Sequence, residues 1–378
     1  MEKALGLYVH VPFCKSKCAY CDFYSLPGKE DRMDAYTEAV CTHLRGFAPR
    51  AAGYQVDTVY FGGGTPSLLG PERLNRIRGT MQEAYRVAED AEVTLEANPD
   101  SVGDWLSDLR GFHRISLGMQ SADDGELRAI GRIHTFQQVR TAVERIRQAG
   151  FGNLSLDLIY GLPAQTLDRW QSSVSAALDL EPEHLSCYGL KLEPGTPLYQ
   201  RREALAIPDE ELQSACYLWT VEELARRGFR QYEISNFAKP GRVSRHNWKY
   251  WTLGEYAGFG PGAHSDFGGE RYAWSRDLEG YCQGVQDGNL SFAERQRISP
   301  EERVREWLML SLRTGDGVDL TEYVRQSERS PERFGPFFDQ CVQAGYAVRR
   351  GSRVALTPRG FLVSNAIIGE VLELHEKE

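Results

Sequence analysis

The sequence predicts an α/β fold, in which an open six-unit (β/α) barrel, a partial TIM-type barrel, precedes a smaller C-terminal α+β region. Short β-rich runs alternate with amphipathic helical patterns over the first 190 residues. Such alternation is typical of parallel strands joined by right-handed helical crossovers. The alternation stops before the eight units of a closed barrel, although periodicity alone also permits a flat doubly wound sheet.

Each barrel unit is predicted from a strand pattern and the helix pattern that follows it. The predicted strands span residues 5–10, 57–61, 92–96, 114–118, 153–158 and 184–188. The predicted helices between them span 32–47, 71–87, 135–149 and 167–178. A loop at 192–199 ends the alternation, and a helix at 209–228 and a strand-like run at 231–235 come next.

The rest of the chain is predicted to form two further regions. Residues 236–281 are aromatic and irregular, and helical patterns follow at 301–312 and 331–344. A hairpin-like run at 347–356 and a helix from Pro358 complete an order that resembles a winged helix. We therefore expect three parts: a barrel domain at 1–235, an aromatic, glycine-rich segment at 236–298 and a winged-helix-like domain at 299–378.

Composition excludes several classes of protein. The chain has 378 residues, 41% of them hydrophobic and 26% charged, which is ordinary for a folded domain. Its net charge of -9 argues against a nucleic-acid partner. No apolar run reaches the roughly 18 residues of a membrane span, and residues 1–10 do not form a signal peptide. We therefore expect a cytoplasmic protein with reduced thiols and no transmembrane segment.

Three of the eight cysteines form a cluster, Cys14-x3-Cys18-x2-Cys21. In a reducing compartment such a cluster indicates metal binding or catalysis rather than disulfides. Three thiolates can hold three corners of a four-iron four-sulfur (4Fe-4S) cluster and leave one iron open. A zinc site with His10 as the fourth ligand is the alternative, although His10 falls inside a predicted strand.

Polar residues or glycines follow all six predicted strands, where parallel α/β folds place their ligand sites. The first strand leads into the cysteine cluster. The later strand ends carry Gly63, Gly64, Thr65, Glu96, Gln120, Asp157 and Gly189. A cap or a turn explains any one of these residues, but not six strand ends in succession. We therefore expect one site at this face of the barrel.

The cysteine cluster, with Tyr20 before its last member, resembles the signature of the radical S-adenosylmethionine superfamily. The resemblance extends to the motifs YVHVPFC at 8–14, FGGGTP at 61–66 and DLIYGLP at 157–163, and it reaches LTPRGF at 356–361. These motifs are similar to the branch that contains oxygen-independent coproporphyrinogen III oxidase and a group of haem chaperones. The chain most resembles the chaperone group, over nearly its whole length.

This resemblance implies two cofactors, a 4Fe-4S cluster and S-adenosyl-L-methionine (SAM), at the barrel mouth. The three clustered cysteines would ligate iron, and the open iron would bind the amino and carboxylate groups of SAM. Gly63, Gly64 and Thr65 would approach that amino acid moiety, since glycine permits close backbone contact. Glu96 would accept a hydrogen bond from a ribose hydroxyl. Other positions that match cofactor contacts of the family are Tyr8, Tyr20, Gln120, Arg132, Asp157 and Gly189.

The segment HNWKYW at 246–251 matches the HNxxYW motif of the chaperone group, which implies that haem is bound there. The matching residues are His246, Asn247, Tyr250 and Trp251. An imidazole is a good axial ligand for haem iron, and aromatic faces suit a porphyrin. On the residues alone, His264, Cys187 and Cys282 are competing axial ligands, and packing in the core is the alternative role for the segment.

Two departures from the oxidase pattern favour a chaperone. Phe23 stands where the oxidase has a fourth cysteine, and only 13 residues precede Cys14. We therefore expect a protein that binds haem and transfers it to a haem-requiring acceptor protein, with a flavodoxin-type protein as the expected electron donor. The alternative is an enzyme, either the oxidase or another radical SAM enzyme that acts on a tetrapyrrole.

Overall fold

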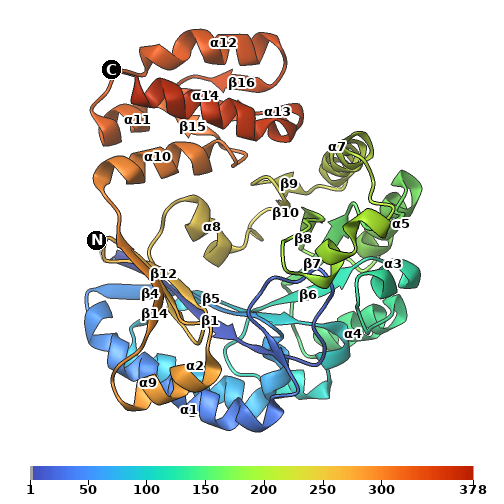
Figure 1. Ribbon diagram of the computed structural model, residues 1–378, viewed down its shortest axis with the longest axis vertical. Coiled ribbons are helices and arrows are strands. Elements are labelled where there is room, and N and C mark those ends of the chain that lie inside the picture. Colours follow the sequence, from blue (N-terminus) through green and yellow to red (C-terminus); the bar gives the residue numbers. More distant parts are fainter. Residues whose placement is uncertain (1–2, 378) are drawn as a thin grey trace.

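The computed structural model describes residues 3–377, and its main layer is a curved, mixed sheet (Figure 1). Six parallel strands form the centre of this sheet in chain order. They are β1 (Lys3–Val11), β4 (Tyr54–Gly63), β5 (Val87–Ala97), β6 (Arg114–Gln120), β7 (Leu154–Tyr160) and β8 (His184–Gly189). All six contain or overlap the predicted strands, so the predicted α/β class and the six units are confirmed.

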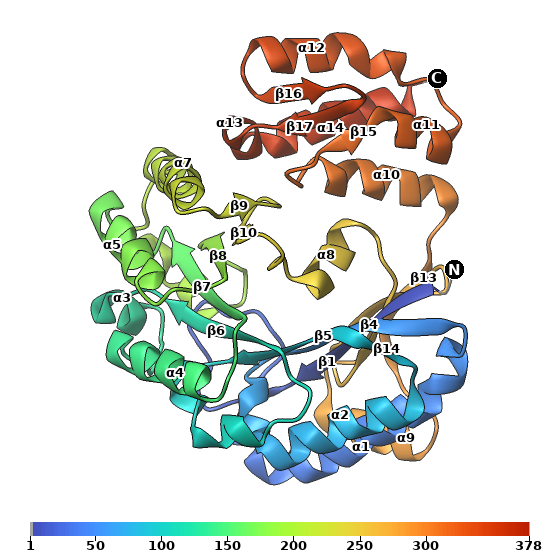
Figure 2. The same ribbon diagram turned by 180° about the vertical axis from the view of Figure 1, so that it is seen from behind.

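Helices cover the outer face of the curved sheet (Figure 2). They are α1 (Met33–Phe47), α2 (Gly70–Ala84), α3 (Asp124–Ala129), α4 (Phe136–Gln148), α5 (Leu167–Leu178) and α7 (Glu210–Arg226), with a short α6 (Pro197–Gln200) in the loop before α7. In α4, Thr135 caps the first turn, and Val139, Val143 and Ile146 bury one face against the sheet. The predicted helices are confirmed, except that α2 ends three residues earlier because β5 begins at Val87, and the six-residue α3 is too short to show a period.

Residues 230–297 extend the sheet at both edges, which corrects the expectation that 236–281 is irregular. Next to β8 lie the antiparallel β10 (Asn236–Ala238) and β9 (Arg230–Gln231). Of the predicted strand at 231–235, only residue 231 belongs to β9, and the rest forms a bend with an isolated bridge from Glu233 to Thr314. Next to β1 lies the parallel β11 (Tyr256–Phe259), followed by the antiparallel strands β12 (His264–Phe267), β13 (Glu270–Trp274) and β14 (Phe292–Arg297). The helices α8 (Arg245–Trp251) and α9 (Leu278–Gln286) lie between these strands in the chain.

The resulting sheet is open, because β14 and β9 form its two edges rather than pairing with each other. The two-stranded β2 (Phe13–Cys14) and β3 (Leu26–Pro27) bracket the loop that carries Cys18 and Cys21. This loop follows β1 at the carboxyl end of the barrel strands. The order of strands therefore brings the cysteine loop and the strand-end residues to the same side of the sheet.

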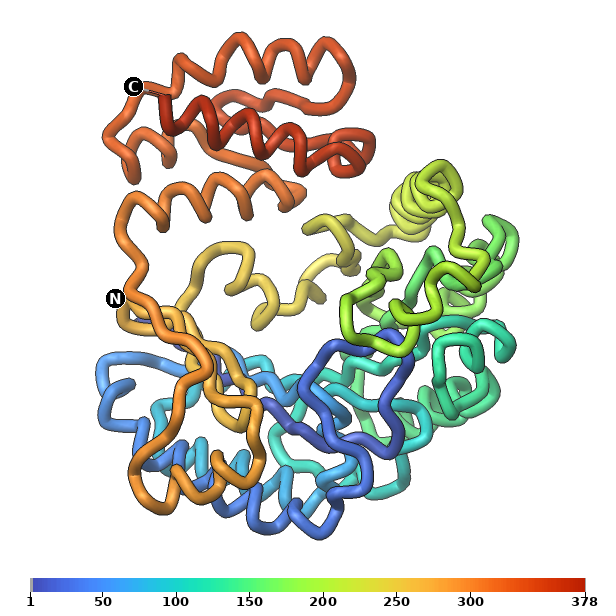
Figure 3. Tube along the Cα trace, in the orientation of Figure 1, coloured from blue at the N-terminus to red at the C-terminus, as the bar shows by residue number. Residues whose placement is uncertain are grey.

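The C-terminal region has its own apolar core and lies beyond the open side of the sheet (Figure 3). Its elements are α10 (Pro300–Ser311), β15 (Val318–Asp319), α11 (Leu320–Ser327), α12 (Gly335–Gln343), β16 (Ala347–Arg350), β17 (Arg353–Leu356), α13 (Pro358–Leu362) and α14 (Ser364–Glu376). The predicted helices and the hairpin are confirmed, whereas α11 was not predicted. Its three strands pair in the order β15-β17-β16. The similarity to a winged helix and the three domain boundaries stay predictions.

No helix within residues 3–377 combines the length and the apolar character that a membrane crossing requires.

Candidate functional site

A cavity of about 990 Å³ lies at the carboxyl ends of the barrel strands. It is lined by residues from the cysteine loop, from all six central strands or the loops after them, and from α8. The predicted site residues on its wall are Tyr8, Cys14, Cys18, Tyr20, Cys21, Gly63, Gly64, Thr65, Glu96, Gln120, Arg132, Asp157, Gly189, Asn247, Tyr250 and Trp251. The structure thus brings together every predicted site residue except His246.

The cysteine loop is held against the turn after β4. The backbone N–H of Gly64 donates to the carbonyl of Val11, and that of Thr65 donates to the carbonyl of Phe13. A side chain at Gly64 would place its Cβ 2.6 Å from the Phe13 carbonyl oxygen and 3.1 Å from the Cys14 sulfur. Only glycine allows this approach, so the sequence at Gly64 fits a loop that presents Cys14 to a bound group.

The three clustered cysteines are free thiols, and all three are partly exposed on the cavity wall. Burial raises the pKa of the Cys14 and Cys21 thiols. These thiols therefore ionise only when a bound cation compensates the negative charge of the thiolate. His10 does not complete a zinc site, since its Nδ1 lies 3.0 Å from the Tyr8 hydroxyl and its Nε2 2.8 Å from the Tyr24 carbonyl. The donor set therefore fits the three-thiolate cluster better than a Cys3His zinc site.

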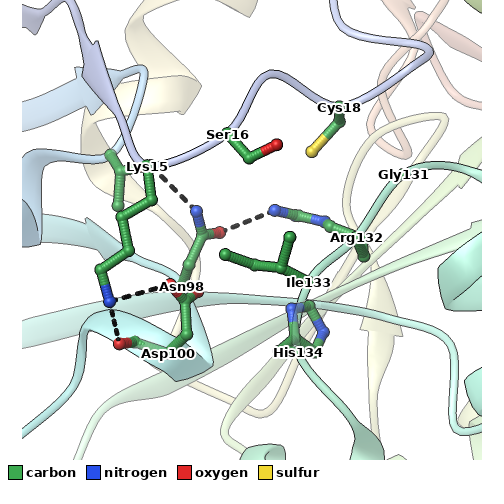
Figure 4. Close-up of a pocket in the computed structure, with 10 residues that line it drawn as sticks. Lys15, Ser16, Cys18, Asn98, Asp100, Gly131, Arg132, Ile133 and His134 are labelled. Carbon is green, nitrogen blue, oxygen red and sulfur yellow. Dashed lines mark hydrogen bonds and ion pairs between the residues drawn. The ribbon is translucent and has the colours of Figure 1, made fainter. Parts of the chain in front are cut away.

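A smaller pocket adjoins Cys18 and is lined mainly by polar side chains, with Ile133 as its apolar side chain (Figure 4). The Asn98 side chain links its walls, because its amide donates to Thr65 Oγ1 at 2.9 Å and its carbonyl accepts from Arg132 Nη1 at 2.9 Å. The Nε of Arg132 is buried without a hydrogen-bond partner. A guanidinium with a free donor beside the cysteine loop suits the carboxylate of an amino acid.

Two carboxylates face the cavity from neighbouring parts of the sheet. Glu96 is the last residue but one of β5 and accepts hydrogen bonds from Tyr60 Oη at 2.8 Å and from the Gly63 N–H at 3.1 Å. Burial raises the pKa of Glu96 to about 7, and the nearby Asp157 charge adds to the rise. Burial also raises the pKa of Asp157, which accepts from Ser116 Oγ at 3.3 Å. Carboxylates held this way can accept hydrogen bonds from hydroxyl groups.

The backbone conformation of Gln120 also supports a ligand site at the strand ends. Gln120 has a φ of 65° and follows a register irregularity between β6 and β7. A bulge of this kind turns a side chain toward a different direction, and Gln120 lines the cavity. Non-glycine residues with a left-handed backbone conformation occur most often at ligand and active sites.

Two buried charged residues in the cavity wall were not predicted. Arg114 begins β6, is 1% exposed and has two guanidinium nitrogens without partners. Glu233 is 0% exposed, and burial raises its pKa to about 7. We expected site residues at the carboxyl ends of the strands, and this expectation missed Arg114 because Arg114 lies at the amino end of its strand. A charged residue at the start of an otherwise apolar strand was the signal that could have found it.

Comparison with known proteins gives two matching family models. Residues 8–177 match the radical SAM superfamily and residues 298–363 match the HemN C-terminal domain. A Bacillus subtilis relative, "Heme chaperone HemW", is 34% identical, over 97% of this chain and 98% of the relative. The Escherichia coli relative of the same name is 33% identical, over 96% of this chain and 97% of the relative. The chain belongs to the HemW family.

A solved structure supports the fold. The chain superposes on the coproporphyrinogen III oxidase HemN from Escherichia coli with a TM-score of 0.83 at 23% identity, over 99% of this chain and 90% of the other. With HemW membership and the superfamily match, the expected 4Fe-4S cluster and SAM are confirmed as the cofactors of this fold. Cys14, Cys18 and Cys21 are the residues that would hold the cluster.

The HemW motif residue His246 does not line the cavity. It is 0% exposed, and its Nδ1 and Nε2 lie 2.9 Å from Thr58 Oγ1 and 3.0 Å from the Tyr250 hydroxyl. Its ring stacks on Tyr60 at 5.2 Å between centroids, and burial lowers its pKa to about 3. This differs from the expectation of an axial ligand, because neither ring nitrogen is free. In this geometry His246 positions the tyrosines of the cavity wall.

The other motif residues do reach the cavity. Asn247, Tyr250 and Trp251 are spaced so that they share one face of α8, and all three line the wall. Of the competing ligands, Cys187 and Cys282 are 3% and 9% exposed and do not line it. His264, in contrast, is exposed and lies on the wall.

Proposed function

We propose that this protein is a haem chaperone, which binds haem in the strand-end cavity and passes it to a haem-requiring acceptor protein. The observation that carries the proposal is the pairing of near-full-length similarity to proteins named heme chaperone HemW with one cavity that contains both the cysteine loop and the aromatic face of α8. Similarity of that extent favours a shared function over a shared fold alone.

The contents of the cavity support separate places for two ligands. The cysteines, Arg132 and Glu96 provide charge and hydrogen bonds at one group of strand ends. Tyr250 and Trp251, on α8, provide flat aromatic surfaces on another part of the wall. At about 990 Å³, the cavity is at the upper end of the range of ordinary small-molecule sites, roughly 300–1,000 Å³. A cavity of this volume suits a large ligand such as a porphyrin.

When bound, the cluster supplies electrons to SAM. The residues of this chain would hold SAM against it: Arg132 at the carboxylate, Glu96 at the ribose and the Gly63–Gly64 turn along the backbone of the amino acid moiety. We propose a flavodoxin-type protein as the electron donor and the cytoplasm as the location. All eight cysteines are free thiols, as a reducing compartment requires.

The alternative function is that of the oxidase, whose fold this chain shares. Phe23 argues against the oxidase function, since Phe23 occupies the position where the oxidase pattern has a cysteine. Phe23 is 64% exposed and lines the cavity. Exposed aromatic surface beside a cavity suits an apolar ligand or a partner protein.

One anaerobic experiment separates the two functions. The purified chain is reconstituted with iron and sulfide, and the same sample is titrated with hemin and assayed for turnover of coproporphyrinogen III with SAM and a reductant. We expect saturable hemin binding, transfer of haem to an apo-haem protein and no decarboxylated product. Steady formation of protoporphyrinogen IX without hemin binding would reject the chaperone proposal.

A further inference from the structure

We propose that His264, oriented by Glu294, is the axial ligand of the haem in this cavity. This inference rests on the proposed function, because it assigns a residue to the haem that the chaperone would carry. His264 begins β12 in the glycine-rich turn GFGPGAHS, outside the HNxxYW segment. The assignment follows from which histidines the fold leaves accessible, and from what their ring nitrogens contact.

The fold buries six of the eight histidines. His10, His43, His134, His184, His246 and His375 are each at most 8% exposed. The two exposed histidines are His113 and His264. His113 precedes β6 and does not line the cavity, whereas His264 does. His10, the other histidine of the wall, has partners at both ring nitrogens. His264 is therefore the accessible imidazole of the cavity.

The sheet register aligns His264 with a carboxylate. His264 on β12 pairs with Ala273 on β13, and Ala273 pairs with Glu294 on β14. Residues directly opposite each other in antiparallel strands project to the same face of the sheet. Accordingly, His264 Nδ1 lies 3.4 Å from Glu294 Oε1. Nε2 of His264 has no hydrogen-bond partner within residues 3–377, so it can bind a metal.

A histidine that binds a metal usually donates its other N–H to a carboxylate, which fixes the tautomer and the ring orientation. In the His264–Glu294 ion pair the carboxylate lies on the Nδ1 side of the ring, 3.4 Å from that nitrogen, which leaves Nε2 on the other side for a metal. The neighbouring charged groups are Glu294, Arg276 and Arg271, and burial together with the two arginines lowers the pKa of His264. A neutral imidazole is the form that ligates iron.

The backbone under His264 is firmly placed. A side chain at Gly258 would place its Cβ 2.1 Å from the His264 carbonyl oxygen, so β11 and β12 approach closely there. Trp274 Nε1 donates to the Gly258 carbonyl at 2.8 Å, and the Gly258 N–H donates to Ser265 Oγ at 2.9 Å. Arg276 also lines the cavity and forms no ion pair within the described residues. Its guanidinium suits a haem propionate.

The test is a hemin titration of the full chain followed by visible absorption. Wild type is compared with His264→Ala, Glu294→Gln and the matched control His113→Ala, which removes the other exposed histidine. His264 and Glu294 are largely exposed, so neither substitution removes core packing. We expect His264→Ala to shift the Soret maximum and to weaken hemin binding at least about tenfold, and Glu294→Gln to weaken it roughly 10- to 100-fold without a change of ligand.

Added imidazole should restore the wild-type spectrum in His264→Ala, because it can occupy the vacated ligand position. The control variant should bind hemin as wild type does. An unchanged spectrum and affinity in His264→Ala, with normal binding by wild type, would overturn the assignment and leave the proposed function intact. Absence of saturable hemin binding by wild type would instead reject the proposed function.

Discussion

At the scale of single residues, Glu96 shows how the cavity holds a carboxylate ready for a ligand. Tyr60 Oη and the Gly63 N–H fix its two oxygens, and Asp157 lies close enough to affect its pKa. Glu255 provides a natural comparison, because it accepts the same kinds of hydrogen bond from Tyr54 Oη at 2.8 Å and from the Gly268 N–H at 2.7 Å. Glu255 does not line the cavity.

We predict that Glu96→Ala weakens SAM binding, because a ribose hydroxyl would lose a charged acceptor. Such a hydrogen bond contributes on the order of 1.5–3 kcal/mol, which corresponds to a loss of affinity of roughly 10- to 150-fold. Isothermal titration of the reconstituted chain with SAM measures the effect. The matched control Glu255→Ala should retain wild-type affinity, and equal losses in both variants would show that Glu96 has no direct role.

Glu233 gives a prediction about pH. Burial raises its pKa to about 7 from the ordinary value of 4.5, so between these values the folded chain retains a proton that the unfolded chain releases. The free energy of unfolding therefore falls as the pH rises through this window. Glu233→Gln removes this titration and should reduce the fall by up to about 3 kcal/mol.

Urea unfolding of the metal-free chain at pH 5 and pH 7 measures that difference. Glu96 has the same raised pKa, so some pH dependence will remain in the Glu233→Gln variant. Glu211→Gln, at an exposed position, serves as the control and should behave like wild type. A Glu233→Gln variant with the full wild-type pH dependence would mean that this carboxyl group is not buried as described.

At the scale of elements, β2 and the loop between β2 and β3 carry the three clustered cysteines. We predict that replacing Cys14, Cys18 or Cys21 by alanine abolishes the brown absorption of the reconstituted cluster, because each thiolate would hold one iron. Cys41→Ala, which removes a buried thiol of α1, should keep it. Stoichiometric zinc without iron in the anaerobically reconstituted wild type would contradict the cluster assignment.

The turn after β4 gives a second prediction at this scale. Gly64→Ala would bring a methyl group within 2.6 Å of the Phe13 carbonyl oxygen, so the cysteine loop must move away. We expect a reduced iron content per chain, measured by metal analysis after reconstitution. Gly79→Ala is the matched control, since that helical position has open space around it and alanine stabilises a helix by about 1 kcal/mol over glycine. Full iron content in Gly64→Ala would show that the loop tolerates the displacement.

At the scale of the whole molecule, an ion network joins the edge of the sheet to the C-terminal region. Asp266 on β12 accepts two hydrogen bonds from Arg303 on α10, at 2.7 and 2.8 Å, and one from Arg271 at 2.9 Å. The Asp266 side chain is 7% exposed. Burial acts to raise the pKa of Asp266, but the two guanidinium groups outweigh it and hold that pKa below its usual value.

We predict that Asp266→Ala destabilises the protein by about 1.5–3 kcal/mol, because Arg303 and Arg271 lose their charge-assisted hydrogen bonds to a buried carboxylate and keep only Glu306 as a counter-charge. Urea unfolding measures the change, and faster proteolysis near α10 should accompany it. In the control Asp34→Ala, the lost partner is Arg73, and the Asp34 side chain is 83% exposed, so we expect a much smaller loss of stability. Similar losses in the two variants would exclude a special role for the network.

Much of the fold and site could be predicted from local sequence patterns. The six central strands show as apolar runs, and parallel order follows from the helices between them. That topology alone brings Glu96, Asp157 and Gly189 to one face, although they lie far apart in the chain. Arg114 and Glu233 escaped prediction because nothing in their immediate sequence shows that they face a cavity.

The sequence by itself determined the α/β architecture, the clustered spacing of the three cysteines and the strand-end positions of the polar residues, because each depends on neighbours in the chain. Tertiary structure decided the place of residues 236–298, in which β11 pairs with β1 from more than 240 positions away and β10 pairs with β8 at the other end of the sheet. It also decided that His246 lies behind the wall and His264 on it. A motif specifies which side chains are present. Which of them are buried depends on the surface against which α8 packs, where Thr58 contacts His246.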